Sequence, residues 1–158
     1  MEAVSTQLNA RLRAGQTVAQ TPPDFSGRTL SQDQRAHHER FKAAAAYAKA
    51  ASRSNPIYAQ LAAGTVKNAY NLALQDWFNP PVIHRIERAE GRIRIRASDN
   101  VMVTGVQVMV LDEAGEVREK GEGIRGEGDW WEYVPAAEGK VVVEARDLAG
   151  NVVRALVE

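Results

Sequence analysis

The residues that could carry chemistry in this chain are few, and their spacing fits none of the common catalytic sites. The chain has 158 residues, with three histidines and no cysteine. The lack of cysteine excludes a thiolate zinc site, an iron–sulfur cluster, a disulfide framework and a cysteine nucleophile. No serine stands in a recognisable hydrolase motif beside a histidine base. The sequence therefore predicts a protein that is not an enzyme.

One glycine motif matches a dinucleotide-binding fingerprint by its letters. Gly121, Gly123 and Gly126 have the spacing G-x-G-x-x-G. That fingerprint requires a preceding strand and a following helix, whose N-terminus meets the phosphate. A tryptophan-rich strand follows here, and Glu122 and Glu127 would repel a phosphate. We interpret the segment as a loop between strands and expect no cofactor.

Two sets of side chains offer ligands for a metal ion. His37 and His38 are adjacent, so on a helix they point about 100° apart and chelate poorly. Several residues near expected turns supply oxygen atoms of the kind that calcium prefers. They are Asp99, Asp112, Asp129, Asp147 and Asn151. Hairpin turns use these residue types for local hydrogen bonds, so calcium binding is allowed but the turn role is favoured, and we predict no metal site.

Composition and charge restrict the class of protein further. Lys plus Arg and Asp plus Glu number 20 each, and 44% of the residues are hydrophobic, as in ordinary globular domains. The zero net charge argues against a dedicated nucleic-acid-binding protein. No apolar run is long enough for a membrane span or a signal peptide. We expect synthesis in the cytoplasm without a signal peptide, and leave a virion or an exported assembly open as the destination.

Three regions follow from the prolines and from a change in hydrophobic period. Residues 1–30 have no sustained periodicity and contain two adjacent prolines, so we expect an extended arm with at most a helical turn over 3–12. Residues 31–81 show helical spacing and residues 82–158 alternate with a period of two. The expected fold class is α+β, with an arm, a small α-helical region and an antiparallel β-sandwich.

The helical region carries start signals for three helices. Ser31 begins the first through a capping box with Gln34. Asn55, followed by proline, begins a short second helix. Thr65 is expected to cap the third helix, which has the clearest amphipathic pattern in the chain and runs through Trp77. We expect the apolar face of this third helix to pack on the β domain.

The β domain resembles bacterial immunoglobulin-like or fibronectin-type repeats. Seven short strands are expected, over 82–86, 93–97, 106–111, 117–119, 130–134, 141–146 and 152–157. The resemblance rests on three runs: Ile93-x-Ile95-x-Ala97-x-Asp99, then Val106-x-Val108-x-Val110-x-Asp112-x-x-Gly115, then Val141-x-Val143-x-Ala145-x-Asp147-x-x-Gly150-Asn151. It implies a seven-stranded immunoglobulin-like sandwich used for adhesion, spacing or decoration of larger assemblies.

The arm has few apolar residues, and we expect those few to contact a partner. They are Val4, Leu8, Leu12 and Phe25. The first three would share one stripe if this part of the arm were helical. The arm has too few apolar groups to build a core, so we expect it to order on a neighbouring chain.

Two further surfaces could bind a partner. Met109 and Leu111 lie on the face of their strand opposite the expected core, and we expect the third helix, or else a neighbouring subunit, to cover them. Trp130 points away from Trp131 and Tyr133 on the same strand. It could be covered by the helical region, anchor a protein partner, or stack on a sugar.

Together these patterns predict a non-enzymatic structural or interaction protein. The leading interpretation is a subunit or decoration of a larger bacterial or phage assembly, such as a capsid, a tail or a surface filament, with protein partners and homo-oligomer formation. One alternative is a carbohydrate- or surface-binding module that uses Trp130. Another is a nucleic-acid-associated accessory protein that uses the basic helix over 35–53, although that helix has few aromatic residues to stack on bases.

Overall fold

The computed structural model describes residues 9–13, 16–20, 24 and 26–157. It divides into two compact units, residues 1–38 and residues 39–158. Among the described helices, none combines the length and the apolar character needed to cross a membrane.

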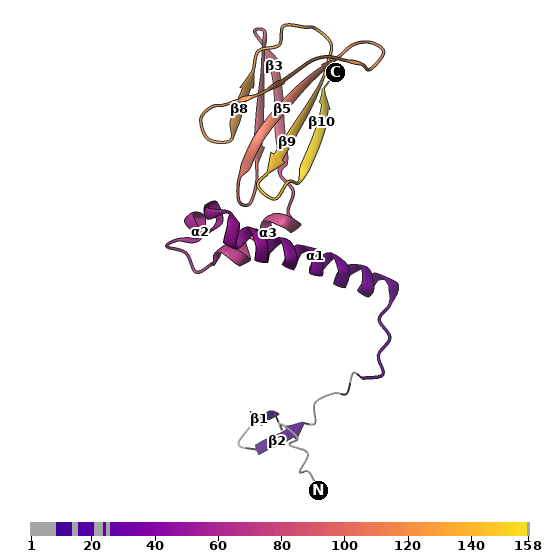
Figure 1. The fold of residues 1–158 in the computed structure, drawn as a ribbon, viewed down its shortest axis with the longest axis vertical. Helices are drawn as coiled ribbons and strands as arrows, with labels where there is room; N and C mark the ends of the chain where they lie inside the picture. Colours follow the sequence, from indigo (N-terminus) through magenta and orange to yellow (C-terminus); the bar gives the residue numbers. More distant parts are fainter. Residues whose placement is uncertain (1–8, 14–15, 21–23, 25, 158) are drawn as a thin grey trace. The chain divides into compact units, whose positions relative to one another are not determined.

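The first unit contains a two-stranded antiparallel sheet (Figure 1). Strand β1 (Asn9–Arg13) pairs with β2 (Gln16–Gln20), with Asn9 opposite Gln20. The helical turn expected over 3–12 is therefore wrong for residues 9–12, because pairing with a second strand outweighs weak local helix propensity. Leu12 lies in β1, whereas the expected anchors Val4, Leu8 and Phe25 lie outside the described residues.

Three helices follow, and their first two start signals are confirmed. They are α1 (Gln32–Ser54), α2 (Pro56–Ala62) and α3 (Ala69–Phe78). At the start of α1, the Ser31 N–H donates to Gln34 Oε1 at 2.9 Å, and the Gln34 N–H donates to Ser31 Oγ at 3.2 Å. At the start of α2, Asn55 Oδ1 accepts a hydrogen bond from the Ile57 N–H at 3.0 Å.

The start of α3 differs from the expected one. Asn68 is its N-cap, with Oδ1 accepting from the Asn71 N–H at 2.8 Å. The Thr65 hydroxyl donates instead to the Ala62 carbonyl at 2.7 Å. Thr65 therefore completes the turn that ends α2, and Val66 after it is fully exposed outside any helix.

Residues 82–157 form two four-stranded antiparallel sheets. One has the order β3 (Val82–Ala89), β4 (Arg92–Ser98), β8 (Trp130–Tyr133), β7 (Ile124–Arg125). The other has the order β10 (Val152–Val157), β9 (Lys140–Asp147), β5 (Val103–Leu111), β6 (Val117–Glu122). The seven expected strands are all present, and β7 is an additional short one. The chain is thus a mixed α+β protein.

The two sheets enclose one core, and the helices form a second one. The first core contains alternating residues of both sheets, such as Ile93 and Ile95 of β4 and Val143 of β9. The second contains small and aromatic residues of the helices: Ala48, Ala51, Tyr58, Ala62, Leu72 and Ala73. Val101 and Leu148, from connections of the β domain, pack against it. The helices therefore pack on one end of the sandwich (Figure 1).

This arrangement corrects the expectation that α3 covers the outer face of β5. Its cluster includes Val101 and Leu148 but not Met109 or Leu111, which are half-buried, so α3 does not cover the outer face of β5. The reason is the short connection of three residues between α3 and β3, which holds the helix at the end of the sheets. Trp77 is half-buried and lies beside Phe78, with ring centroids 5.1 Å apart.

Candidate functional site at the helix–sandwich junction

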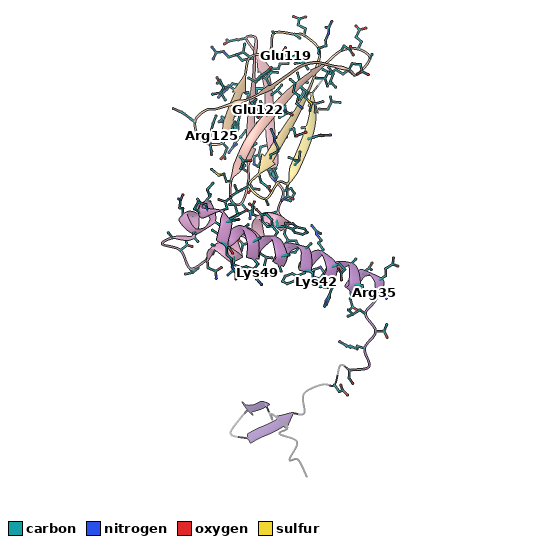
Figure 2. All side chains as sticks on the ribbon, viewed as in Figure 1. Arg35, Lys42, Lys49, Glu119, Glu122 and Arg125 are labelled. Atoms are coloured by element: carbon teal, nitrogen blue, oxygen red, sulfur yellow. The ribbon has the colours of Figure 1, made fainter. Side chains whose placement is uncertain are left out.

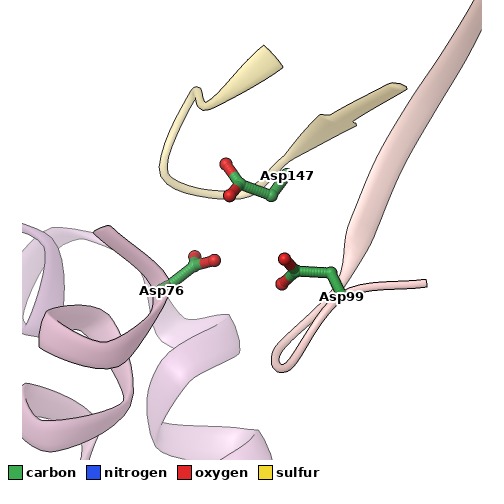
Figure 3. A group of neighbouring side chains, drawn as sticks. All are labelled: Asp76, Asp99 and Asp147. Carbon is green, nitrogen blue, oxygen red and sulfur yellow. The ribbon is translucent and has the colours of Figure 1, made fainter. Parts of the chain in front are cut away.

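Three aspartate carboxylates meet where the helices contact the sandwich (Figure 3). Asp76 belongs to α3, Asp99 follows β4, and Asp147 is the last residue of β9. One oxygen atom of each lies within 4.8 Å of the others. Asp76 is 0% exposed and Asp147 is 3% exposed. Such close, buried carboxylates require a compensating charge or a proton.

Local structure explains how each side chain reaches the site. Asp76 lies three and four residues after the buried Ala73 and Leu72, so helical periodicity turns it inward. Asp99 Oδ2 accepts hydrogen bonds from the Val101 and Met102 N–H groups at 2.8 and 3.0 Å. This Asp99 contact is the turn role that the sequence predicted.

Asp147 also has its predicted turn role. Its Oδ1 accepts a hydrogen bond from the Asn151 N–H at 2.7 Å, within the connection between β9 and β10. Its Oδ2 accepts from Asn151 Nδ2 at 2.8 Å. Both oxygens are therefore fixed in position by a single neighbour four residues later.

A pair of tyrosines supports Asp76 from the helical side. The Tyr58 hydroxyl donates to Asp76 Oδ2 at 2.5 Å, and Tyr58 is 0% exposed. The Tyr47 and Tyr58 hydroxyl oxygens are 2.5 Å apart, and the Tyr47 hydroxyl also approaches the Leu148 carbonyl at 3.4 Å. Hydroxyl groups of α1 and α2 therefore connect α3 to the β9–β10 connection.

Burial is the largest electrostatic effect at the site. Burial raises the pKa of Asp76 to about 7; the Tyr58 hydrogen bond opposes this rise, and the charges of Asp147 and Asp99 add to it. Burial also raises the pKa of Asp147, against the hydrogen bonds from Asn151. Oδ1 of Asp76 and Oδ1 of Asp99 are buried and have no hydrogen-bond partner. The site thus holds unbalanced negative charge and two unsatisfied acceptors.

The structure brings together only part of the predicted oxygen-ligand set. Asp99, Asp147 and Asn151 meet at the site, whereas Asp112 Oδ1 accepts from the Glu116 N–H at 2.9 Å in another turn and Asp129 is exposed. Turn signals do not identify Asp76, because it lies within the helix α3. The signal that could have found it is an acidic residue on the apolar stripe of an amphipathic helix.

The glycine motif has a packing role within the sheets. Gly121 lies in β6, and the Tyr133 ring crosses it so closely that a Cβ atom there would be 2.5 Å from Tyr133 Cε2. A Cβ on Gly123 would be 3.3 Å from the Val106 carbonyl oxygen. Strands β7 and β8 follow, so the helix that a dinucleotide site needs does not come next.

The tryptophan pair confirms the predicted alternation in β8. Trp131 is buried at 7% exposure in the sandwich core, and Trp130 is half-buried on the outer face. The Arg94 guanidinium lies 4.5 Å from the centroid of the Trp130 ring. One ring face that a sugar would use is therefore occupied by Arg94.

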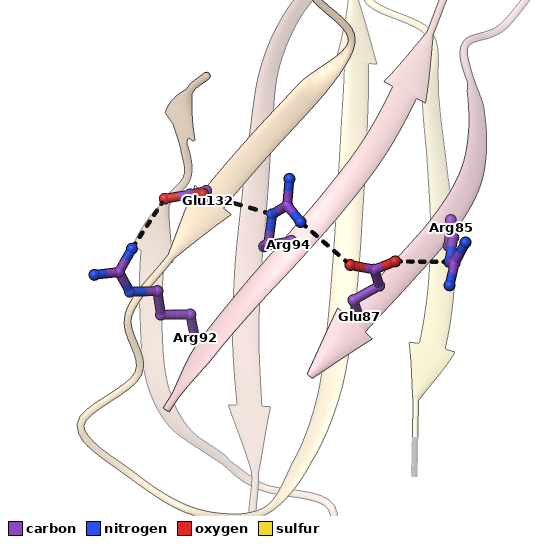
Figure 4. Close-up of polar contacts among 5 residues, drawn as sticks. All are labelled: Arg85, Glu87, Arg92, Arg94 and Glu132. Carbon is purple, nitrogen blue, oxygen red and sulfur yellow. Dashed lines mark hydrogen bonds and ion pairs between the residues drawn. The ribbon is translucent and has the colours of Figure 1, made fainter. Parts of the chain in front are cut away.

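Arg94 is part of a row of ion pairs on that outer face (Figure 4). The row runs across β8, β4 and β3: Arg92 to Glu132 at 3.7 Å, Glu132 to Arg94 at 3.5 Å, Arg94 to Glu87 at 3.5 Å and Glu87 to Arg85 at 2.8 Å. Exposed pairs of this kind contribute only about 0–1 kcal/mol each. They mark this face of the sheet as solvated.

Three of the basic residues of α1 form one stripe. Arg35, Lys42 and Lys49 are spaced by seven residues and project from the helix (Figure 2). Ala44 and Ala48 are buried on the opposite side. The stripe is exposed, and aromatic residues do not alternate with it.

Comparison of the chain with protein-family models, with curated proteins and with solved structures finds no match.

Proposed function

We propose that this chain is a non-enzymatic structural subunit of a larger protein assembly, built from copies of itself. The β domain is proposed to be of the immunoglobulin-like type. Support comes from the strand order: β3-β4-β8-β7 and β10-β9-β5-β6 follow the order A-B-E-D and G-F-C-C′ of such sandwiches.

The observation that carries the proposal is the hairpin β1–β2. Among the described residues it forms a sheet of two strands, within the compact unit of residues 1–38. A two-stranded hairpin is marginally stable in water, and its outer edges hold backbone groups that can pair with another chain. Addition of such a hairpin to the edge of a sheet in a neighbouring copy would stabilise the hairpin and join the two copies.

The second unit suits the role of a rigid building block. Tyr47 contacts Leu148, and Asn151 contacts the end of α3, so hydrogen bonds as well as apolar packing join the helices to the sandwich. Met109 and Leu111 are half-buried on the outer face of β5. A neighbouring subunit is the proposed cover for this face.

Removal of residues 1–30 tests the proposal. The full chain is expected to associate in size-exclusion chromatography with light scattering, and the truncated chain to elute as a monomer with an almost unchanged melting temperature. Equal association of both chains would contradict the role of the arm. A loss of several kcal/mol of stability on truncation would instead place the arm within the fold of its own chain.

A further inference from the structure

We propose that Asp76, Asp99 and Asp147 bind a divalent cation, and that the cation is calcium. Asp76 belongs to α3, Asp99 follows β4 of one sheet, and Asp147 ends β9 of the other. An ion among them would therefore connect the helices to both sheets. This site is independent of the proposed assembly role.

Two oxygen atoms point to a ligand beyond the clustering of acidic residues. Oδ1 of Asp76 and Oδ1 of Asp99 are buried and accept no hydrogen bond, and Asp76 is 0% exposed. The three carboxylates are directed toward one another (Figure 3). A buried acceptor without a partner is costly, and carboxylates that face each other repel. A cation between them would satisfy both oxygens and neutralise the repulsion.

The remaining oxygens of these side chains are already held by donors. Asp76 Oδ2 accepts from the Tyr58 hydroxyl, and Asp99 Oδ2 accepts from two backbone N–H groups. In both residues one oxygen therefore fixes the side chain and the other is left for the shared space. These hydrogen bonds pre-organise the site for a ligand, because the Asp76 and Asp99 side chains have little rotamer freedom left to lose on binding.

The chemistry of the donors selects calcium among the common metal ions. All the ligand atoms are carboxylate oxygens, which are hard donors, whereas zinc and copper sites usually include histidine or cysteine. Magnesium keeps several of its waters and is usually held by one or two carboxylates. Three carboxylates, two of them almost fully buried, suit a larger ion that exchanges water for protein oxygens more readily.

A proton shared between Asp76 and Asp99 is the competing occupant. It would also relieve the repulsion, and it fits a pKa of Asp76 raised by burial. The two occupants predict different responses to calcium. Calcium stabilises the folded chain only if it binds there, whereas a shared proton leaves calcium without a site.

Thermal unfolding of the full chain distinguishes a bound calcium ion from a shared proton. The chain is treated with a chelator, dialysed and melted with increasing calcium chloride, up to the millimolar range in which weak extracellular calcium modules bind. Calcium at about 100 times its dissociation constant should raise the melting temperature by on the order of 10 °C. Magnesium chloride at the same concentrations should raise it by less than half as much.

Two substitutions each remove one carboxylate oxygen that would bind the ion and keep the local hydrogen bonds. In Asp76→Asn and Asp99→Asn the amide oxygen can still accept from Tyr58 or from the backbone, and the amide nitrogen replaces the unpartnered oxygen. Each variant should lose the calcium response. Asp129→Asn makes the same change of charge at an exposed position and should keep the full response.

Terbium provides a second measurement on the unaltered chain. This ion occupies calcium sites, and its emission rises when an excited tyrosine lies nearby, as Tyr58 does beside Asp76. We expect sensitised terbium emission that decreases when calcium is added and displaces the terbium ion.

The proposal is overturned if calcium shifts neither the melting temperature nor the terbium emission, or if magnesium acts as strongly as calcium. An increase in metal-free stability of Asp76→Asn with no calcium response in the parent would identify the shared proton.

Discussion

Asn151 holds the backbone of Asp76, not its carboxylate. Asn151 Nδ2 donates to the Asp76 carbonyl oxygen at 2.9 Å and approaches the Trp77 carbonyl oxygen at 3.3 Å. The last carbonyls of a helix have no intrahelical donor, so this side chain supplies one from a residue far along the chain. The connection between β9 and β10 is thereby attached to the end of α3.

Asn151→Ala should weaken this attachment. The substitution removes the side-chain donor from the Asp76 and Trp77 carbonyls, of which the Asp76 carbonyl keeps only the Asn79 N–H at 3.3 Å. It also removes the hydrogen bond from the Asn151 side chain to Asp147 Oδ2. We expect a loss of about 1–3 kcal/mol in the free energy of unfolding, measured by urea denaturation. Asn71→Ala, at an exposed position of α3, should change it by less than about 0.5 kcal/mol. Equal effects of the two substitutions would contradict this attachment.

Tyr58→Phe should destabilise the junction through one hydroxyl group. Tyr58 is fully buried, and removal of its hydroxyl takes the donor from Asp76 Oδ2. The expected loss is about 1–3 kcal/mol at neutral pH, because a buried carboxylate is left unsatisfied. Tyr70→Phe is the matched control, since Tyr70 is half-buried in the same cluster. A loss below about 0.5 kcal/mol for Tyr58→Phe would show that the hydroxyl pair does not support Asp76.

Gly121→Ala should destabilise the fold through a steric conflict with the Tyr133 ring. Its Cβ atom would lie 2.5 Å from Tyr133 Cε2, and the hydroxyl of that ring donates to Glu119 at 2.7 Å. The ring must move and strain the hydrogen bond, at a cost of about 1–3 kcal/mol. In Gly105→Ala the nearest atom would be Glu122 Oε2 at 3.7 Å, so that variant should be close to neutral. Chemical denaturation of both variants gives the comparison.

The pH dependence of the β domain should include a contribution from Glu119. The Tyr133 hydrogen bond, and then the backbone N–H groups of Ala136 and Ala137, hold the pKa of Glu119 below its usual value of 4.5. A lowered folded-state pKa means that the stabilisation is present above pH 4.5 and is lost as the pH falls through the folded-state value.

Glu119→Gln provides the test of that contribution. The variant cannot titrate at this position, so its melting temperature should fall less steeply than that of the parent as the pH drops below about 4.5. Glu113→Gln, at an exposed turn position, should retain the parent profile. Parallel acid profiles for the parent and Glu119→Gln would show that the contact does not stabilise the fold.

The elements of the β domain were largely predictable, because each strand has one apolar face and ends at a turn signal. Ile93 and Ile95 alternate with arginines, and this pattern alone predicts strand β4 and its buried face. In the helical region, the capping box at Ser31 likewise predicts the start of α1 from neighbouring residues alone. Where two local rules competed, the prediction failed. Thr65 could cap the following helix or close the preceding turn, and the contact with Ala62 decides in favour of the turn.

The candidate site was predictable only in part. Asp99 and Asp147 carry turn signals that a single sequence shows, and both make the expected backbone hydrogen bonds. Their meeting with Asp76 depends on the docking of α3 on the end of the sandwich, which is a tertiary contact between distant segments. Local pattern cannot give such a contact, and the same limit explains why α3 was wrongly placed over Met109.

Hydrogen exchange of the full chain, measured at low and at high protein concentration, tests the assembly proposal most directly. If β1–β2 pairs with a neighbouring copy, amides in residues 9–13 and 16–20 should gain protection as concentration rises, while protection of the sandwich core stays constant. Fast exchange of these amides at every concentration, with a chain that remains monomeric, would contradict the account.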